Sequence, residues 1–311
     1  MLHQKKIVVV YHKNCIDGFG AAWSAWKKFG DNASYIGLTR DMDIPHFANI
    51  DTLYFLDFTY PKSITKNIVD TNNHVCILDH HISEKDAVAL AHEPLFDNDR
   101  SGAMIAWEYF HKGQQAPALI TYIQDNDLFT RKLPNIREMM AALSLEPHDF
   151  QRFSDLAATL ESPEGRLEYI EKGKTLVKAE ERAVQKLLSF ADTIEFEGYQ
   201  TMAVNTILYY SQTAAAMYLD LGFPLGLTWS YRGSNKIHVS LRSDGTTVDC
   251  AQLAKKYGGG GHKGAAGFII DFNGSFPWKR LEKDHETTVM YDTREPVSPK
   301  RSGGEPITAK P

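Results

Sequence analysis

The chain has 311 residues, a formal net charge of −5 and a hydrophobic content of 43%. Such a length holds one large domain or two ordinary ones, and the apolar content is sufficient for a buried core. The negative charge argues against a protein that coats nucleic acid non-specifically, because binding along a phosphate backbone favours a basic surface.

The sequence also argues against a secreted or membrane protein. No run of apolar residues approaches the length that spans a bilayer. The run near the N-terminus, Ile7 to Tyr11, is too short for the core of a signal peptide. The cysteines, Cys15, Cys76 and Cys250, are scattered and odd in number, which suggests neither a disulfide framework nor a structural zinc site. We therefore expect a cytoplasmic protein.

Short apolar runs alternate with helical patterns in the first part of the chain. The strand candidates are residues 7–10, 53–56 and 75–78, and residues 18–29 carry the apolar face of a helix. Apolar strands separated by helices are typical of a parallel sheet. Ligands of such sheets bind beyond the carboxyl ends of the strands, so the residues after each run are candidates for a site.

Acidic or imidazole side chains follow each of these runs. The first run leads into His12 and Asp17, the second into Asp57, and the third into Asp79-His80-His81. A single Asp after a strand is more often a turn former or helix cap, but the combination favours a metal site. Carboxylates together with imidazoles favour Mn²⁺ or a similar ion. Two ions roughly 3.5–4 Å apart could act on a phosphoryl group, with Asp57 placed to bridge them.

A helical stretch and a second mixed pattern follow. Residues 139–190 are helical in pattern, and their last part is expected to be a long helix that joins two domains. The turn-like residues 232–235 suggest a hairpin. The other elements predicted in this part are strands at 201–204, 225–231 and 236–241 and a helix at 213–221. From about Glu295 we expect a disordered tail, since hydrophobic periodicity is lost.

A glycine-rich segment and an arginine are candidates for anion binding in this part. Gly259, Gly260 and Gly261 precede His262, and glycines let backbone N–H groups approach an anion closely. The segment alone could equally be a flexible loop, but the His-Lys pair that follows it favours phosphate or nucleotide binding. Arg242 suits bidentate contact with an oxyanion, although an arginine at a strand end can simply face water.

Two weaker features have plain structural explanations. Ser101 precedes a predicted helix whose N-terminus could hold an anion, but Ser101 serves equally well as an ordinary cap. Tryptophans could stack on nucleobases, but the spacing of Trp23 and Trp26 favours packing in the core.

Four ordered motifs resemble those of the phosphoesterase superfamily named DHH after its Asp-His-His motif. They are residues 12–20, 56–57, 78–81 and 124–129, and the glycine-rich segment resembles the DHHA1 domain of one branch. The resemblance covers roughly residues 5 to 272. Members hydrolyse phosphoanhydrides or phosphodiesters, and they include pyrophosphatases, exopolyphosphatases, single-strand exonucleases, nanoRNases and cyclic-dinucleotide phosphodiesterases.

The resemblance implies an α/β fold. A parallel-sheet DHH domain would be joined by a helical linker to a smaller α/β DHHA1 domain, with the active-site cleft between them. The implied boundaries are residues 1–150 for the DHH domain, 151–192 for the linker, 193–275 for the DHHA1 domain and 276–311 for a C-terminal tail.

The resemblance also implies roles for the site residues. The implied metal ligands are His12, Asp17, Asp57, His80 and Asp125, with Asp57 bridging two ions. Asp125 is preferred to Asp127 because it keeps the spacing to an aromatic residue, Phe129. Together with Asp57, His81 would act in catalysis by facing the substrate phosphate, and Asp79 would support the neighbouring imidazole. The implied substrate contacts are His81, Arg242, Gly259, Gly260, Gly261 and His262.

The first motif departs from the family pattern. The family has two aspartates flanking one residue, and here the position of the earlier aspartate falls at or beside Cys15, with Asn14 and Cys15 as substitutes. An Asn oxygen is a poorer ligand for a hard cation, and a thiolate prefers softer metals. The site that contains His12 could therefore bind more weakly, or take a different ion, than in relatives.

These features predict a metal-dependent phosphodiesterase that hydrolyses short oligonucleotides or linear or cyclic dinucleotides through metal-activated hydroxide. The expected cofactor is one or two Mn²⁺ ions, with Mg²⁺ or Co²⁺ as substitutes. The expected partner is the nucleotide substrate, not a long duplex or a membrane, and a homodimer is left open. The alternatives are a phosphoanhydride hydrolase acting on polyphosphate or pyrophosphate, and a nucleotide-binding protein with impaired catalysis.

Overall fold

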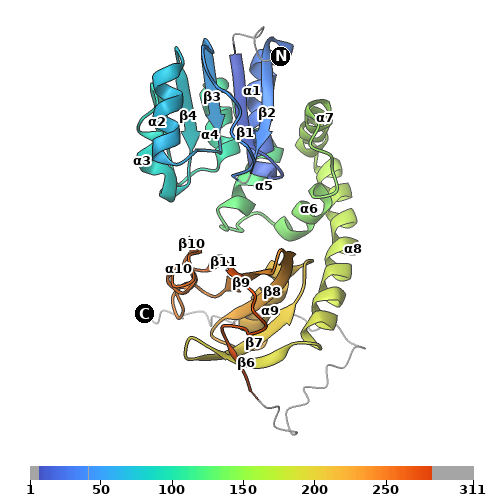
Figure 1. Cartoon of the computed structure of the whole chain (residues 1–311). Coiled ribbons are helices and arrows are strands. Elements are labelled where there is room, and N and C mark those ends of the chain that lie inside the picture. The colour runs from blue at the N-terminus through green and yellow to red at the C-terminus, as the bar shows by residue number, and fades with distance from the viewer. Residues whose placement is uncertain (1–6, 41, 282–311) are drawn as a thin grey trace, which may run out of the picture. The chain divides into compact units, whose positions relative to one another are not determined.

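Five parallel strands form the sheet of the first part of the chain (Figure 1). A computed structural model describes residues 7–40 and 42–281, which divide into two compact units between Arg182 and Ala183. The strand order is β2-β1-β3-β4-β5, and all neighbours are parallel. The strands are β1 Ile7–His12, β2 Ala33–Leu38, β3 Thr52–Leu56, β4 Val75–Asp79 and β5 Glu93–Phe96. This confirms the predicted α/β class with a parallel sheet.

Helices cover both faces of this sheet, and for that reason its central strands are apolar on both sides. Val8 and Val10 belong to the core beneath α2 and α3, whereas Val9 belongs to the core beneath α1 and α4. The helices of this part are α1 Ile16–Phe29, α2 Lys62–Thr71, α3 Lys85–Val88, α4 Gly102–Phe110, α5 Ala118–Asp127, α6 Ile136–Leu143, α7 Phe150–Glu161 and α8 Pro163–Leu188.

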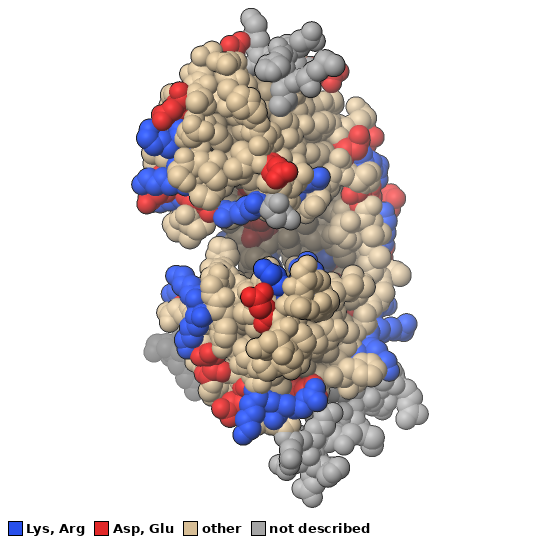
Figure 2. Space-filling model, viewed as in Figure 1, with Lys and Arg blue, Asp and Glu red and all other residues tan. Residues whose placement is uncertain are grey.

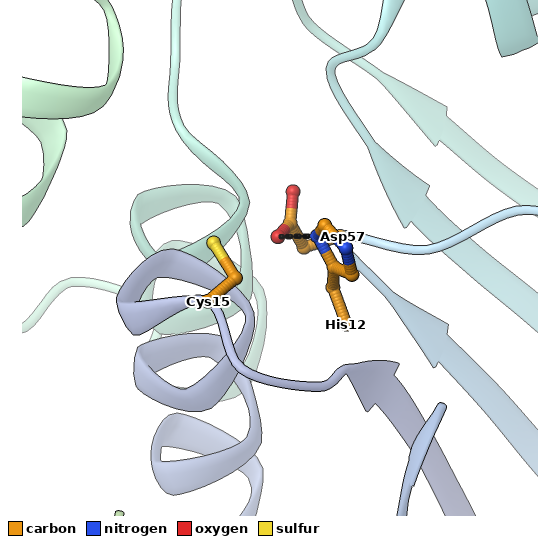
Figure 3. A group of neighbouring side chains, drawn as sticks. All are labelled: His12, Cys15 and Asp57. Carbon is orange, nitrogen blue, oxygen red and sulfur yellow. Dashed lines mark ion pairs between the residues drawn. The ribbon is translucent and has the colours of Figure 1, made fainter. Parts of the chain in front are cut away.

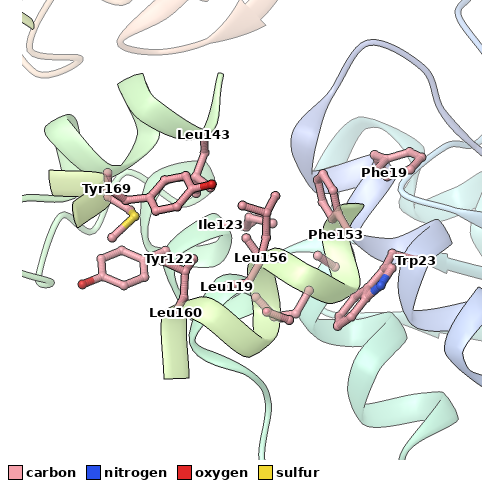
Figure 4. Close-up of a cluster of buried hydrophobic side chains, with 14 of the residues drawn as sticks. Phe19, Trp23, Leu119, Tyr122, Ile123, Leu143, Phe153, Leu156, Leu160 and Tyr169 are labelled. Atoms are coloured by element: carbon pink, nitrogen blue, oxygen red, sulfur yellow. The ribbon is translucent and has the colours of Figure 1, made fainter. Parts of the chain in front are cut away.

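A further core, shown in Figure 4, joins α1 to the helices that follow the sheet. Trp23 is 1% exposed, stacks on Trp107 with ring centroids 5.6 Å apart, and donates from its indole N–H to the hydroxyl of Ser154 at 3.1 Å. Trp23 is therefore a core residue, as its spacing predicted. Phe153 of α7 and Tyr169 of α8 lie in the same core. The first part of the predicted linker 151–192 thus packs into the first unit, because its apolar face is buried there.

The second unit is a seven-stranded sheet in the order β10-β11-β9-β8-β7-β6-β12. Only the β7–β8 pair is parallel among its described pairs. The strands are β6 Asp192–Phe196, β7 Tyr199–Asn205, β8 Gly226–Gly233, β9 Lys236–Arg242, β10 Gly260–His262, β11 Ala265–Asp271 and β12 Lys279–Arg280, and the helices are α9 Tyr210–Leu219 and α10 Cys250–Lys255. The predicted hairpin is confirmed: β8 and β9 are antiparallel, and Ser234 and Asn235 in the turn have positive φ angles.

The beginning of the predicted tail 276–311 belongs to the second unit, which corrects that boundary. Lys279 and Arg280 form β12, which pairs with β6. Phe276 and Trp278 stack with ring centroids 4.7 Å apart and pack against the core of this unit. Two large aromatic residues therefore anchor a segment whose composition looked like that of a tail. The part from about Glu295, expected to be disordered, lies outside the described residues.

Charges of both signs are interspersed over the visible face of each unit (Figure 2). This distribution fits a net charge of only −5 on 311 residues. Among residues 7–40 and 42–281, no helix combines the length and the apolar character that crossing a membrane requires.

Candidate metal centre and substrate-binding residues

Imidazole and carboxylate side chains meet at the carboxyl edge of the parallel sheet. The chain passes from β1 to β2 on one side and to β3 on the other, so the edge between β1 and β3 is where the direction of winding reverses. Such a point is where open α/β sheets bind ligands. Three groups of side chains there could each hold a metal ion, with ligand atoms within 4.8 Å of one another. The groups are His12, Cys15 and Asp57; Asp57, His80 and His81; and Asp17, His80 and Asp127.

Asp57 is common to two of these groups. It is 2% exposed and has a positive φ of 55°, a conformation that costs free energy in a residue other than glycine. Its Oδ2 lies 3.6 Å from His12 Nδ1, and its Oδ1 lies 3.2 Å from His80 Nε2. Each carboxylate oxygen of Asp57 thus faces a different imidazole, as a bridging ligand requires.

The geometry around Oδ1 of Asp57 fits the coordination of a cation. Although His80 Nε2 is 3.2 Å away, Oδ1 has no aligned hydrogen-bond donor among the described residues. Because no donor is aligned with this buried oxygen, a cation held by Asp57 and His80 would stabilise it better than the imidazole contact alone. Burial raises the pKa of Asp57, but its contacts with His12 and His80 outweigh burial and lower that pKa to about 2.

Asp17 also reaches this cluster, from the first turn of α1. Its carboxylate accepts hydrogen bonds from the backbone N–H groups of Gly102 at 2.7 Å and Ala103 at 3.0 Å. The N-terminus of α4 therefore does bind an anion, but the anion is Asp17 of the same chain, while Ser101 caps the helix by accepting from Met104 N. Burial, followed by the charges of Asp57 and Asp127, raises the pKa of Asp17 well above its usual value. A bound cation would relieve this crowding of carboxylates.

Gly102 allows α4 to approach Asp57 closely. A Cβ at this position would lie 2.5 Å from Cβ and 2.9 Å from Cγ of Asp57, so a side chain would displace the carboxylate. We expect Gly102→Ala to weaken metal binding roughly 10–100-fold, as does the loss of other contacts that support metal ligands. Isothermal titration with Mn²⁺ measures this change.

A matched control for that variant is Gly165→Ala. The new Cβ would lie 2.0 Å from the backbone oxygen of Thr159, a comparable clash in the helical part of the unit. It should lower the thermal midpoint but leave the Mn²⁺ affinity of the folded protein unchanged. Wild-type affinity in Gly102→Ala would show that Asp57 does not depend on this close approach.

His80 contacts three carboxylates through one nitrogen. Its Nε2 lies 3.2 Å from Asp57 Oδ1, 3.6 Å from Asp127 Oδ2 and 3.9 Å from Asp17 Oδ2. Burial lowers the pKa of His80, but the contact with Asp57 and the negative charges of all three carboxylates outweigh it and raise the pKa to about 9. A proton on His80 therefore takes the place of a cation in the metal-free protein.

Because a metal ion must displace that proton, metal affinity should depend on pH. Between pH 6.5 and pH 8.5, below the pKa of about 9, we expect the Kd to fall about tenfold per pH unit for each proton released. The raised pKa has the opposite effect on the metal-free protein, whose stabilisation by protonated His80 is present below pH 6.5 and is lost as the pH rises through about 9. Mn²⁺ titrations across this range measure the slope, and a Kd independent of pH would contradict the assignment.

His81 is held mainly by Asp79, although its Nδ1 also lies 3.8 Å from Asp57 Oδ1. Asp79 is fully buried, and its Oδ1 lies 2.7 Å from His81 Nδ1, while its Oδ2 accepts from the hydroxyl of Thr59. With Nδ1 engaged, His81 can direct Nε2 to another group. Burial lowers the pKa of His81, but the hydrogen bond to Asp79 and the charges of Asp57 and Asp79 raise it overall, which favours a cationic donor. This arrangement suits the predicted contact of His81 with a phosphate.

The structure corrects the choice between the two acids of the fourth motif. Asp125 is 6% exposed, and its carboxylate accepts from the backbone N–H groups of Lys132 and Leu133 at 2.9 Å each and from the hydroxyl of Thr130. Its carboxylate thus stabilises the turn after α5. Asp127 is the acid that faces His80, at 3.6 Å. The spacing to Phe129 was misleading as a guide. Phe129 is 71% exposed, so its packing does not determine which side of α5 faces the cluster.

Of the two residues at the departure in the first motif, Cys15 is the one that lies near other candidate ligands. Asn14 is exposed and has a positive φ of 60°, whereas Cys15 is half-buried at the start of α1 and belongs to the group with His12 and Asp57 (Figure 3). Burial and the charges of Asp57 and Asp17 raise the pKa of the Cys15 thiol to about 12. In the metal-free protein Cys15 is therefore a neutral thiol.

Two of the predicted substrate contacts of the second unit, Arg242 and His262, lie in one row across its sheet. Arg242 in β9 and His262 in β10 both pair with Ala265 of the intervening β11, so their side chains share a face. Arg242 is positioned by donating from Nε to the hydroxyl of Ser211 at 2.9 Å and from Nη1 to that of Ser240 at 3.1 Å. Gly260 and His262 are exposed. At Gly259 a Cβ would lie 2.2 Å from the oxygen of Gly267, so packing alone requires glycine there.

A cavity on this unit contains residues that the sequence did not single out. It has a volume of about 340 Å³ and is lined by Thr206, Ile207, Tyr210, Thr228, Trp229, Ser230, Tyr231, Arg232 and His238. His238 and Arg242 alternate with apolar residues along β9 and therefore point to the same face. This alternation is the feature of the sequence from which His238 could have been predicted to lie on the same face as Arg242. Burial and the charges of Arg232 and Arg242 lower the pKa of His238, so a cationic environment surrounds it.

Comparisons with known proteins reveal distant relatives. No family model matches the chain. The chain is 25% identical over 309 residues to the uncharacterized protein R106 of Acanthamoeba polyphaga mimivirus, covering 88% of this chain and 70% of that protein.

Several solved structures are similar over most of the chain. The pGpG-specific phosphodiesterase PggH from Vibrio cholerae is 12% identical, with a TM-score of 0.47 over 85% of this chain and 93% of that one. The DHH domain of a member of a family of ribosomal proteins is 12% identical, with a TM-score of 0.49 over 86% and 83%. RecJ from Thermus thermophilus, solved with Mn²⁺, is 16% identical, with a TM-score of 0.46 over 87% and 50%. These TM-scores lie below 0.5, so the function is inferred from the motifs and the geometry of this chain.

Proposed function

We propose that the chain is a metal-dependent phosphoesterase of the DHH/DHHA1 type that hydrolyses phosphodiester bonds of short nucleotides. The observation that carries this proposal is the position of Asp57. Its buried carboxylate faces His12 with one oxygen and His80 with the other, and it belongs to two groups of candidate ligands. A carboxylate that served only structure would be expected to have hydrogen bonds to both oxygens, as Asp125 has.

The side chains present fit a pair of divalent ions. Asp17, His80, Asp127 and one oxygen of Asp57 would hold one ion, and His12, Cys15 and the other oxygen of Asp57 would hold the second. Ions bound there would lower the pKa of a water molecule and stabilise charge on the phosphoryl group.

The chain's own residues would bind and orient the substrate. His81, held through Nδ1 by Asp79, would donate from Nε2 to a phosphate oxygen. Asp79 is a positioning residue, because its carboxylate contacts His81 and the backbone N–H groups of His80 and His81. Mutation of Asp79 would therefore act through the orientation of His81.

The second unit supports a nucleotide as the substrate class. Its cavity offers the aromatic rings of Tyr210 and Trp229, on which a base can stack, together with Arg232, which can contact a phosphate. Arg242 and His262 add a cation and an imidazole on one face of the same sheet. A polyphosphate chain has no group that would use the aromatic rings, and for this reason we favour phosphodiesters over phosphoanhydrides.

A substrate panel tests this proposal. Metal-free protein is reloaded with Mn²⁺, Mg²⁺ or Co²⁺ and assayed on a linear dinucleotide, a cyclic dinucleotide and polyphosphate. We expect metal-dependent release of mononucleotide from the dinucleotides to exceed release of phosphate from polyphosphate. Faster release from polyphosphate would favour the phosphoanhydride alternative. Tight nucleotide binding without turnover of any substrate would favour a non-catalytic protein, the alternative suggested by Cys15 in the first motif.

A further inference from the structure

Cys15 differs from the other two cysteines in its surroundings. Cys76 is fully buried in the apolar core of the sheet, and Cys250 is fully buried and donates to the hydroxyl of Ser243 at 3.2 Å. Cys15 is half-buried, and its sulfur lies within 4.8 Å of ligand atoms of His12 and Asp57. Figure 3 shows that the three side chains come from the start of α1, the end of β1 and the segment after β3. Three chain segments thus bring a nitrogen, a sulfur and an oxygen together.

The carboxylate of Asp57 connects this group to the neighbouring ion position. Asp57 is 2% exposed, and its Oδ1 faces His80 Nε2 at 3.2 Å, in the neighbouring position. Its Oδ2 is directed at His12. Oδ2 is therefore the oxygen that could join the nitrogen of His12 and the sulfur of Cys15 around one ion.

The donor atoms of the two ion positions differ in softness. The neighbouring position has His80 Nε2 within 3.9 Å of carboxylate oxygens of Asp17, Asp57 and Asp127, and three carboxylates with one imidazole suit Mn²⁺ or Mg²⁺. The position formed by His12, Cys15 and Asp57 includes a sulfur, and thiolates favour Zn²⁺ and similar ions over Mg²⁺ and Mn²⁺. The same carboxylate, Asp57, would join the two.

We propose that Cys15 is a metal ligand and that the His12–Cys15–Asp57 position selects Zn²⁺, which makes the centre heterometallic with Mn²⁺ or Mg²⁺ in the neighbouring position. This inference rests on the metal centre of the proposed function. When Zn²⁺ binds, the Cys15 thiol loses its proton to the buffer and a Zn–S bond forms. No electron is transferred.

Cobalt titration reports a metal–sulfur bond directly. Metal-free protein is titrated with Co²⁺, and binding is followed both by calorimetry and by the near-ultraviolet charge-transfer absorption that a thiolate ligand produces. We expect this absorption in the wild type and in Cys250→Ser, the matched control thiol, and its loss in Cys15→Ser and Cys15→Asp. Persistence of the band in Cys15→Ser, or calorimetric binding of two Co²⁺ ions by the wild type without a band, would overturn the proposal.

Competition between metals tests the selectivity. After dialysis against equal concentrations of Zn²⁺ and Mn²⁺, we expect the wild type to retain one Zn²⁺ per chain. In Cys15→Asp, which restores the carboxylate of the family pattern, the preference for Zn²⁺ over Mn²⁺ should fall roughly 10–100-fold, the range typical of altered metal sites. An unchanged preference would contradict the selection by Cys15.

A wild-type measurement keeps the proposal testable if these variants do not fold. Cys15 is the one cysteine of the three that is not fully buried, so it should react first with a thiol reagent. Zn²⁺ should slow this reaction at least tenfold, and equal rates with and without bound Zn²⁺ would overturn the proposal. Substrate turnover enters none of these measurements. Hydrolysis without a metal–sulfur bond would therefore refute only this inference, and a metal–sulfur bond without hydrolysis would refute only the proposed function.

Discussion

Asp57→Asn should lower metal-dependent hydrolysis by about 10³-fold and reduce the bound metal below two ions per chain. The two oxygens of Asp57 face His12 and His80, so an amide removes the charge and one of the oxygens from the shared position. The expected 10³-fold loss corresponds to about 4 kcal/mol of lost charge stabilisation by the ions, since each 1.36 kcal/mol is a factor of ten in rate. Steady-state kinetics with a dinucleotide and elemental analysis of the purified protein measure the two effects.

Asp70→Asn is the matched control for that variant. Asp70 makes an exposed ion pair with Lys66 at 2.7 Å, and such pairs contribute little to stability. Its rate and metal content should equal those of the wild type. If Asp57→Asn also kept both metal ions and the full rate, the carboxylate could not be a bridging ligand.

Asp127→Ala and Asp125→Ala should have opposite effects, although the two residues are neighbours in sequence. Asp127 faces His80 at 3.6 Å, so its loss should weaken Mn²⁺ binding by roughly 10–100-fold or more. Asp125 accepts from the backbone N–H groups of Lys132 and Leu133, so its loss should lower the free energy of unfolding by about 1–3 kcal/mol. Calorimetric Mn²⁺ affinity and urea unfolding of the metal-free protein separate the two effects.

Each variant of this pair serves as the control for the other. Asp125→Ala that remains folded should bind Mn²⁺ like the wild type, and metal-free Asp127→Ala should unfold without a large loss of stability. A strong loss of Mn²⁺ affinity in Asp125→Ala together with normal affinity in Asp127→Ala would restore the assignment that the sequence favoured.

The contrast between these two acids shows where sequence reasoning succeeded and where it stopped. His12, Asp57 and His80 were predicted to lie together, because parallel strands end at one edge of a sheet and each residue stands within two positions of the end of an apolar run. Asp125 and Asp127 lie instead on a helix, where residues two positions apart point roughly 200° away from each other. Which of them faces the cluster depends on how α5 is rotated against the rest of the unit. The residues near Asp125 and Asp127 in the sequence do not determine this rotation.

The same limit applies to the elements at the sheet edges. β2 and β5 are half-exposed edge strands, so their sequences lack the continuous apolar runs of β1, β3 and β4. β12 is only two residues long, and Phe276 and Trp278 anchor the segment before it through contacts that are distant in sequence. Cys15 was recognised as a departure, but the choice between Cys15 and Asn14 required the backbone conformation, since Asn14 has a positive φ.

The candidate ligands of the centre extend from His12 to Asp127, across most of the first unit, and among the described residues none lies in the second. An unfolded chain cannot hold these ligands together, so ions that bind the folded unit stabilise it by RT ln(1 + [M]/Kd), about 2.7 kcal/mol at a hundred times the Kd. Chelation should therefore lower the melting transition of the first unit and leave that of the second unchanged. In a cell, the supply of free metal ion would then govern how long the first unit withstands proteolysis.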